Sequence, residues 1–180
     1  PLYDSFEARL ARIAGFSESE LRERIVSVMD IEDNDIVLEV CIGTGSNIPY
    51  YRKYTQNLIV GIDISEKMIS ICMDKVKKFR YGDIELVLGC AEYLPFKKEL
   101  FDRVLIGGAF SYMNNPRRAL AEACRVTRKN GIVVVYDQIT WFDKILGKDR
   151  LPIKLKPDNL ELVEYEYLFD KHFYIAKFVK

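Results

Sequence analysis

The sequence predicts a doubly wound α/β fold with a mostly parallel, seven-stranded sheet that ends in an antiparallel hairpin. Three observations support this fold class. Short runs rich in Val, Ile and Leu alternate with helical patterns along the chain. Those runs are apolar almost throughout, as in parallel strands that are covered on both faces. The carboxyl-terminal stretch instead indicates two consecutive strands joined by a tight turn. At 180 residues the chain is most simply one domain.

The first half of the pattern begins with a helix. Ser17 and Glu20 form a capping box at its start, and residues 1–34 are expected to make an N-terminal helical cap. One face of this helix then carries Leu21, Ile25 and Val28. Five buried strands are expected at residues 36–40, 58–63, 84–89, 103–108 and 132–137.

Helices are expected between these strands. A short one covers residues 47–54, and Ser65 caps a longer one. Asn115-Pro116 opens a further helix, which Asn130-Gly131 should stop. The inward face of the longer helix should carry Met68, Ile69, Cys72, Val76 and Phe79, and its solvated face Lys75, Lys77 and Lys78.

The chain changes character after residue 137. Residues 138–159 show no clear element, and the hairpin is expected at residues 160–169 and 173–179. His172, the single histidine, falls in its turn and is interpreted as a solvated turn residue rather than a catalytic base.

The composition excludes several classes of function. Lys and Arg balance Asp and Glu at 27 each, which argues against a nucleic-acid partner because such proteins usually carry a basic stripe. The four cysteines are scattered and form no metal-binding cluster, so no metal is expected. No signal-like start and no apolar run near about 18 residues is present, which predicts a cytoplasmic chain without an integral membrane segment.

The stretch "LEVCIGTG" (residues 38–45) is a strand followed by a glycine turn. Gly43 and Gly45 suit a turn that lets a ligand approach the backbone. A dinucleotide loop is disfavoured, because Ile48 stands where its third glycine belongs and Glu39 would repel a pyrophosphate. Asp63 ends the second strand, where a carboxylate can bind both hydroxyls of a ribose. A ligand with a ribose, positive charge and no phosphate satisfies these requirements, and S-adenosylmethionine is such a ligand.

Four spaced stretches resemble one family. They are "VLEVCIGTG", "VGIDIS" followed by "EKM", "GCAEYLPF", and the run from "FDRVLIGG" through "NGIVVVYD". In this order and spacing they resemble class I S-adenosylmethionine-dependent methyltransferases over about residues 35–137. The resemblance implies a Rossmann-like methyltransferase fold, S-adenosylmethionine as cofactor with S-adenosylhomocysteine as product, and a small-molecule acceptor of the quinone, phospholipid or thiol type. Residues 35–137 would be the cofactor-binding core, and residues 138–180 the acceptor-side segment with the hairpin.

The resemblance also implies roles for individual residues. Glu39 and the turn around Cys41 and Asn47 would hold the methionine end of the cofactor, and Asp63 the ribose. The full set of expected cofactor-binding residues is Tyr3, Glu39, Cys41, Gly43, Thr44, Gly45, Asn47, Asp63, Ile64, Met68, Cys90, Ala91, Glu92, Ile106 and Gly107. Cys90 departs from the Asp of many relatives, because a thiol is a poor acceptor for the adenine amino group. Cys41 is interpreted as a small residue tolerated in place of glycine, with a functional thiol as the alternative.

Methyl transfer from a sulfonium needs alignment more than acid–base chemistry, so few catalytic side chains are expected. Candidates near the acceptor are Ser111, Tyr112, Asp137 and Gln138, and Trp141 and Phe142 could line an acceptor pocket or the core. A monomer or homodimer is expected. The alternative function is a non-catalytic S-adenosylmethionine-binding accessory or regulatory protein.

Overall fold

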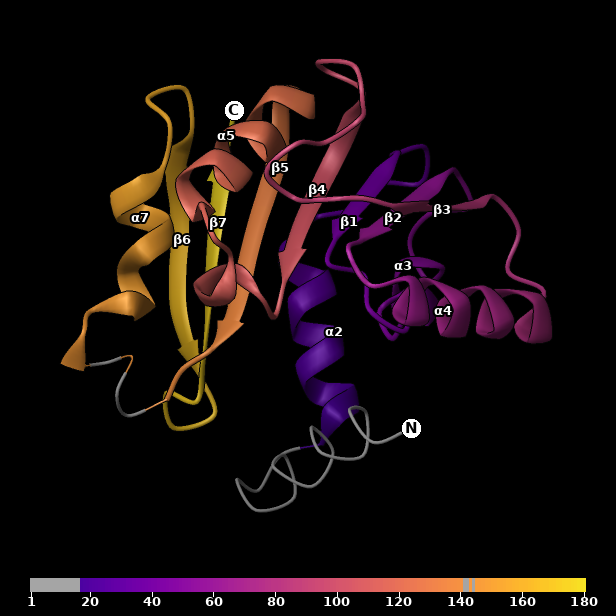
Figure 1. The fold of residues 1–180 in the computed structure, drawn as a ribbon, viewed down its shortest axis with the longest axis horizontal. Helices are drawn as coiled ribbons and strands as arrows, with labels where there is room; N and C mark the ends of the chain where they lie inside the picture. The colour runs from indigo at the N-terminus through magenta and orange to yellow at the C-terminus, as the bar shows by residue number, and fades with distance from the viewer. Residues whose placement is uncertain (1–16, 141–142, 144) are drawn as a thin grey trace.

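The computed structural model describes residues 17–140, 143 and 145–180. Its centre is one seven-stranded sheet with the strand order β3-β2-β1-β4-β5-β7-β6 (Figure 1). Strands β1 to β5 are parallel, and β7 lies antiparallel between β5 and β6, which confirms the predicted fold class and terminal hairpin. The strands are β1 Val37–Val40, β2 Ile59–Asp63, β3 Ile84–Leu88, β4 Phe101–Gly107, β5 Thr127–Gln138, β6 Glu161–Leu168 and β7 Phe173–Val179.

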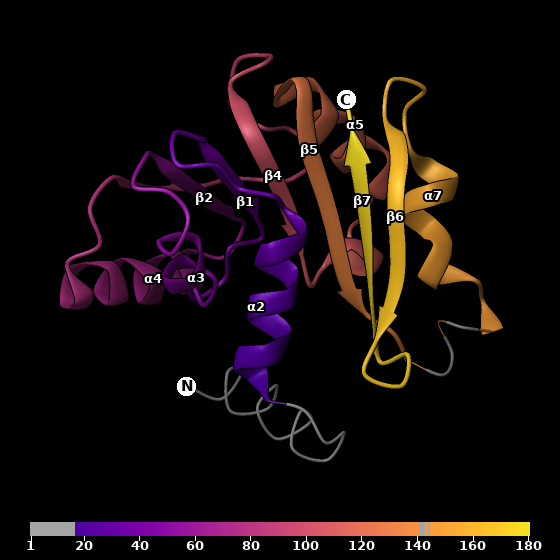
Figure 2. The same cartoon turned by 180° about the vertical axis from the view of Figure 1, so that it is seen from behind.

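Helices cover both faces of the sheet. Helix α2 lies across one face, as the view from behind shows (Figure 2), and α3 and α4 extend this layer toward β2 and β3. Helices α5 and α7 cover the opposite face. The helices are α2 Glu18–Val28, α3 Ile48–Tyr51, α4 Glu66–Phe79, η1 Phe110–Tyr112, α5 Pro116–Val126, η2 Lys148–Arg150 and α7 Leu151–Leu155. None of the helices in the described ranges is both long and apolar enough to cross a bilayer.

The predicted helix starts are confirmed. The Ser17 hydroxyl accepts a hydrogen bond from the Glu20 amide at 3.1 Å, and the Glu20 carboxylate accepts one from the Ser17 amide at 2.7 Å. The Ser65 hydroxyl accepts from the amide of Met68, and Asn115 caps α5 with Pro116 at its first position.

One boundary was predicted wrongly. Helix α5 ends at Val126 and β5 begins at Thr127, so Asn130-Gly131 lies inside a strand rather than at a helix end. Thr127 adopts extended backbone angles and pairs with Phe101 of β4, while its hydroxyl donates to the carbonyl of Ala123 at 2.7 Å. A side-chain bond of this kind ends the helix without glycine.

Three smaller expectations were also wrong. Phe79 is 57% exposed, because it is the last residue of α4 and lies beyond the packed part of that helix. Lys75 is partly buried and donates to the Thr44 hydroxyl at 2.9 Å rather than lying on a solvated face. Residues 138–159 contain η2 and α7.

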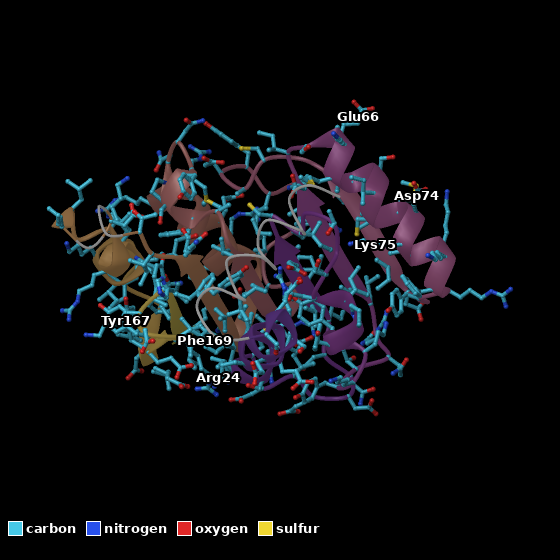
Figure 3. The ribbon with its side chains drawn as sticks, turned by 90° about the horizontal axis from the view of Figure 1, so that it is seen from below. Arg24, Glu66, Asp74, Lys75, Tyr167 and Phe169 are labelled. Carbon is cyan, nitrogen blue, oxygen red and sulfur yellow. The ribbon has the colours of Figure 1, made fainter. Side chains whose placement is uncertain are left out.

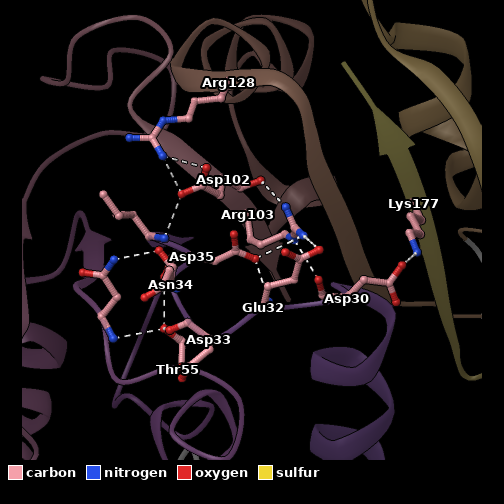
Figure 4. A network of polar contacts seen from close by, with 12 residues as sticks. Asp30, Glu32, Asp33, Asn34, Asp35, Thr55, Asp102, Arg103, Arg128 and Lys177 are labelled. Carbon is pink, nitrogen blue, oxygen red and sulfur yellow. Dashed lines mark hydrogen bonds and ion pairs between the residues drawn. The ribbon is translucent and has the colours of Figure 1, made fainter.

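Charged side chains tie together the amino ends of the strands (Figure 4). Arg103 at the start of β4 forms an ion pair with Asp35 at 3.1 Å and donates to the carbonyl of Asp30. Asp102 accepts from the Ile36 amide at 2.9 Å, and Arg128 Nη1 donates to both of its carboxylate oxygens, at 2.7 and 2.8 Å. This network lies at the edge opposite the glycine turn and is therefore structural.

The alternation of side chains in the strands decides which residues meet at the carboxyl edge. Val37 of β1 packs on the α2 face, and Leu38 and Val40 on the α5 face, so Glu39 points toward α2. The strand order reverses between β1 and β4, which is where ligands bind in doubly wound sheets. The turn after β1 begins at this point.

Candidate functional site

Two adjoining cavities open at the carboxyl ends of β1, β2 and β4. Their volumes are about 250 and 200 Å³, and together they fall in the lower part of the range of roughly 300–1,000 Å³ usual for small ligands. Cys41, Asp63 and Ala109 line both. The first cavity is also lined by Arg22, Glu39, Ile42, Gly43, Thr44, Ser46, Ser65, Met68, Gly107, Gly108 and Tyr136. The second is also lined by Val40, Ile62, Ile64, Gly89, Cys90, Ala91, Glu92, Tyr112, Met113 and Asn114.

Glu39 is a buried carboxylate in the wall of the first cavity. Its side chain is 3% exposed, and its Oε1 accepts a hydrogen bond from Asn47 Nδ2 at 2.7 Å. Oε2 has no partner at hydrogen-bonding distance and angle among the described residues. Burial raises the pKa of Glu39 to about 7 from an ordinary 4.5. The buried Tyr51 hydroxyl, which also lacks such a partner, acts to lower the pKa of this carboxylate, but the effect of burial is larger. A buried carboxylate with an unsatisfied oxygen is costly, so the site suits a ligand that brings a cation or a donor.

Arg22 brings the opposite charge to the same cavity. It comes from α2, is 8% exposed, and its Nη1 lies 3.5 Å from Asn47 Oδ1 and 3.4 Å from the Tyr136 hydroxyl. The Asn47 side chain therefore lies between Arg22 and Glu39, accepting a hydrogen bond from the first and donating one to the second. An anion and a cation held in one small cavity are complementary to a zwitterion such as the amino-acid end of S-adenosylmethionine.

Asp63 links the glycine turn to the next strand. Its Oδ2 accepts from the Gly43 amide at 2.9 Å, and its Oδ1 accepts from the Ser65 amide at 2.9 Å. Each carboxylate oxygen can accept a second hydrogen bond. Because Asp63 also lines both cavities, its remaining acceptor capacity lies where a ribose between them would place its hydroxyls.

The turn itself requires unusual backbone angles. Cys41, Gly43 and Gly45 have φ of 63°, 56° and 75°. A side chain on Gly43 would meet no atom within 4 Å, which leaves open space at the cavity, whereas one on Gly45 would meet Cys72 Sγ at 2.6 Å. The first residue of the turn is thus a cysteine in a left-handed conformation that glycine adopts at lower cost.

The Cys41 thiol lies between the two cavities. Burial raises its pKa to about 12, so the thiol is protonated and is not a nucleophile at neutral pH. This favours the interpretation of Cys41 as a small residue that the turn tolerates.

Lys75 supports the turn from the side of α4. Seen from below, it lies on the inner side of that helix, whereas Glu66 and Asp74 lie on the outer side (Figure 3). Its bond to Thr44 fixes a hydroxyl that lines the first cavity. We infer that this contact holds the turn in shape.

The second cavity is mainly apolar. Its polar groups include Cys90 and Glu92, and the Cys90 thiol donates to the Glu92 carboxylate at 2.7 Å. Glu92 also accepts from the Asn115 amide at 3.2 Å. A flat base that carries an amino group fits this combination of apolar walls and a carboxylate.

The four candidates near the acceptor have different environments. Asp137 is fully buried, and its Oδ2 accepts from both the amide and the hydroxyl of Ser111 at 2.7 Å. Burial raises the pKa of Asp137, and the Gln138 amide donates to its other oxygen. Asp137 thus anchors the segment after β4. Tyr112 is 71% exposed at the second cavity.

The structure places most of the expected cofactor-binding residues on these cavities. Exceptions among the described residues are Gly45, which lies inside the turn, Asn47, which lies beneath Glu39, and Ile106, whose side chain is in the core. Tyr3, Trp141 and Phe142 lie outside the described residues. His172 is exposed in the turn of the hairpin, as expected.

Arg22 and Tyr136 were missed by the sequence reasoning. The signal for Arg22 was present, because it shares a helical face with Ile25, Val26 and Met29, which are all buried. A charged residue on a buried face indicates a buried partner. Tyr136 follows from the alternation along β5, which points it to the same face as Glu39.

The burial of Glu39 generates a prediction about stability. Because its pKa is raised in the folded state, folding binds a proton between pH 4.5 and about 7, and the free energy of unfolding falls as the pH rises through that window. Above pH 7 the raised pKa of Glu39 lowers the free energy of unfolding by about 3 kcal/mol. We expect Glu39→Gln to be more stable than the parent at pH 8, by about 1–3 kcal/mol, and nearly equal at pH 5. Urea unfolding at both pH values measures this.

The control for that measurement is Glu85→Gln, since Glu85 is exposed on β3. Its stability should match the parent at both pH values. A Glu39→Gln variant that is less stable than the parent at pH 8 would show that the carboxylate is well satisfied in the folded state.

The orphaned oxygen of Glu39, the cation beside it and the open space over Gly43 fit S-adenosylmethionine. Comparisons with known proteins point the same way. Residues 38–135 match the model of the family described as "Methyltransferase domain". The chain is 30% identical over 135 residues to the demethylmenaquinone methyltransferase of Bacillus subtilis, covering 74% of this chain and 58% of the relative. It is 35% identical over 114 residues to that of Renibacterium salmoninarum, covering 63% and 46%.

Solved structures share the fold. The [4+2]-cyclase SpnF superposes with a TM-score of 0.78 at 16% identity, covering 89% of this chain and 80% of that one. Geranyl diphosphate C-methyltransferase from Streptomyces coelicolor, solved with S-adenosyl-L-homocysteine, gives 0.76 at 13% identity, covering 91% and 80%. The chain spans about half the length of the relatives that it matches in sequence. The match to the family model covers more than half of the chain, which therefore belongs to the class I S-adenosylmethionine-dependent methyltransferases.

Proposed function

We propose that this chain binds S-adenosylmethionine across the two cavities and transfers its methyl group to a small-molecule acceptor. The observation that carries the proposal is the presence of two buried, oppositely charged side chains, Glu39 with its unpartnered oxygen and Arg22, in the wall of one cavity. Glu39 would hold the α-ammonium of the cofactor and Arg22 its α-carboxylate. A ligand without a cationic group would leave the buried Glu39 carboxylate uncompensated.

This orientation of the amino-acid end determines where the ribose and the adenine of the cofactor would lie. Asp63, between the cavities, would bind the ribose hydroxyls, and Glu92 and Ala91 would lie against the adenine with Ile64. Gly107 and Met68 would close the walls of the first cavity. The role of Tyr3 stays a prediction, because it lies outside the described residues.

The residues of the chain contribute alignment more than acid–base chemistry. S-adenosylmethionine, when bound, supplies a methyl group already activated on a sulfonium. Glu39, Arg22 and Asp63 fix both ends of the ligand, which sets the direction in which the methyl group points. Ser111 and Asp137 bond to each other and hold the segment that ends at Tyr112. We propose that Tyr112 contacts the acceptor, and that Ser111 and Asp137 position Tyr112 by holding its segment in place.

The acceptor class comes from the sequence relatives. Two relatives at 30% and 35% identity are demethylmenaquinone methyltransferases, which supports an apolar aromatic acceptor of the hydroquinone type. The free thiols of Cys41, Cys72, Cys90 and Cys124 support a cytoplasmic location. A monomer or homodimer without a nucleic-acid partner stays a prediction.

Two assays test the proposal. Calorimetric titration with S-adenosylmethionine and S-adenosylhomocysteine measures binding, and transfer of a radiolabelled methyl group to soluble naphthohydroquinones measures catalysis. We expect binding of both nucleosides and a methylated hydroquinone. Absence of binding would overturn the site. Binding without transfer to hydroquinones, phospholipid head groups or thiols would instead favour the accessory-protein alternative.

The role of Arg22 generates a prediction about ligand selectivity. Arg22→Met should weaken S-adenosylhomocysteine by about tenfold or more, since it removes a charge-assisted bond to the carboxylate. Methylthioadenosine, which lacks the amino-acid end, should bind as it does to the parent. Arg24→Met is the matched control, because Arg24 pairs with Glu164 and Glu166 on the surface. Equal losses for both ligands would mean that Arg22 only supports the fold.

The backbone of Cys41 generates a second prediction. Cys41→Gly should bind S-adenosylhomocysteine within about threefold of the parent, because glycine prefers the left-handed conformation. Cys41→Val should lose at least about tenfold, since a branched side chain is strained at this φ and fills the junction of the cavities. Calorimetric titration compares the two. A similar loss in both variants would assign a binding role to the thiol itself.

A further inference from the structure

A pair of exposed apolar side chains follows the carboxyl end of β5. Ile145 is 63% exposed and Leu146 is 65% exposed. Over the described ranges, no other two consecutive large apolar residues are both exposed. The pair is thus distinct from apolar residues scattered singly over a surface, which are common and need no explanation.

Cations accompany this pair. Residues 145–156 contain Lys148, Arg150, Lys154 and Lys156 against one acid, Asp149, which gives a net charge of +3. The whole chain has a net charge of zero, so the other residues together carry −3. We name residues 145–156 the basic–apolar surface. Its charge is therefore a local property that the overall composition hides.

Two of the cations, Lys148 and Lys154, lie near the turn that carries the apolar pair. Lys154 Nζ donates to the carbonyl of Gly147, the residue that follows Leu146, at 3.3 Å. Lys148 Nζ lies 3.7 Å from Asp143 Oδ1 and is 40% exposed, and Arg150 is exposed. Lys154 thus borders the turn that carries Ile145 and Leu146, whereas Lys148 pairs with Asp143 and Lys156 Nζ donates to the carbonyl of Leu160 at 2.9 Å.

The rest of the segment is anchored. Leu151 and Leu155 of α7 pack against the main core cluster, and Pro152 is buried. This anchoring fixes α7 on the sheet and leaves Ile145 and Leu146 on the outside. The turn before α7 lies toward the lower edge in Figure 1, the edge to which the arrowheads of β4 and β5 point. The cavities open at the same edge.

We infer that the basic–apolar surface binds the interface of a lipid bilayer that contains anionic lipid. Cations are attracted by acidic head groups, and exposed Ile and Leu side chains can enter the boundary with the acyl chains. Nucleic acid would account for the cations but not for the exposed apolar pair. Such docking would place the edge with the cavities near acceptors dissolved in the membrane. The inference goes beyond the proposed function, because it concerns a surface outside the cavities.

Sedimentation with lipid vesicles tests the inference. We expect the chain to co-sediment with vesicles of phosphatidylcholine mixed with phosphatidylglycerol, and not with phosphatidylcholine alone. Ile145→Ser with Leu146→Ser should lower the partition coefficient by about tenfold. Arg150→Gln should lower it by about fivefold, the effect of one charge near an anionic surface, and added salt should weaken binding of the parent.

Matched controls come from other parts of the chain. Val163→Ser removes a side chain that is 58% exposed on β6, beside Glu164, and Lys77→Gln removes a cation on α4. Both should bind vesicles like the parent. No binding to anionic vesicles, or equal losses in the controls, would overturn the inference. Capture by polyglutamate with the same dependence on Ile145 and Leu146 would also overturn it, in favour of an acidic protein partner.

Titration of each variant with S-adenosylhomocysteine separates this inference from the proposed function. Unchanged cofactor binding shows that the variants are folded, because the cavities contain none of the substituted residues. Vesicle binding can therefore fail while cofactor binding succeeds, and the reverse.

Discussion

The burial of one incompletely satisfied carboxylate is the constraint on which the site depends. Glu39 sits at the end of the central strand with one oxygen held by Asn47 and the other without a partner among the described residues. The free energy of unfolding would be higher with a neutral side chain at this position. The cost becomes useful when a cationic ligand arrives, because the ligand compensates a charge that the protein has already buried. Strained or unsatisfied groups of this kind are typical of binding sites.

The topology of the sheet brings the partners of Glu39 together. Glu39 and Tyr136 come from different strands but face the same helix, because side chains alternate along each strand. Helix α2 then places Arg22 over that face, far from Glu39 in sequence. The ion pairs at the opposite edge, such as Arg103 with Asp35, hold the amino ends of the strands and leave the carboxyl edge free for ligands. The amino edge of the sheet therefore stabilises the fold, and the carboxyl edge forms the candidate binding site.

Much of the fold and part of the site could be predicted from the sequence. Strand and helix order follow from apolar periodicity, and Glu39 and Asp63 follow from their positions at strand ends. Arg22 was not found, because its role depends on how α2 crosses the sheet, which is a tertiary property. The end of α5 was misplaced since Asn130-Gly131 is a strong stop signal, while the observed stop depends on the pairing of Thr127 with Phe101. The contact of Lys75 with Thr44 likewise depends on the approach of α4 to the turn.

The direct test of this account is the number of protons released when the ligand binds. Titration with S-adenosylhomocysteine at pH 6, in buffers of different ionisation enthalpy, measures that number. With a pKa of about 7 for Glu39 in the free protein, binding of the ligand ammonium should release about 0.9 proton per molecule bound. The Glu39→Gln variant should release none and bind more weakly. Binding without proton release by the parent chain would contradict the account.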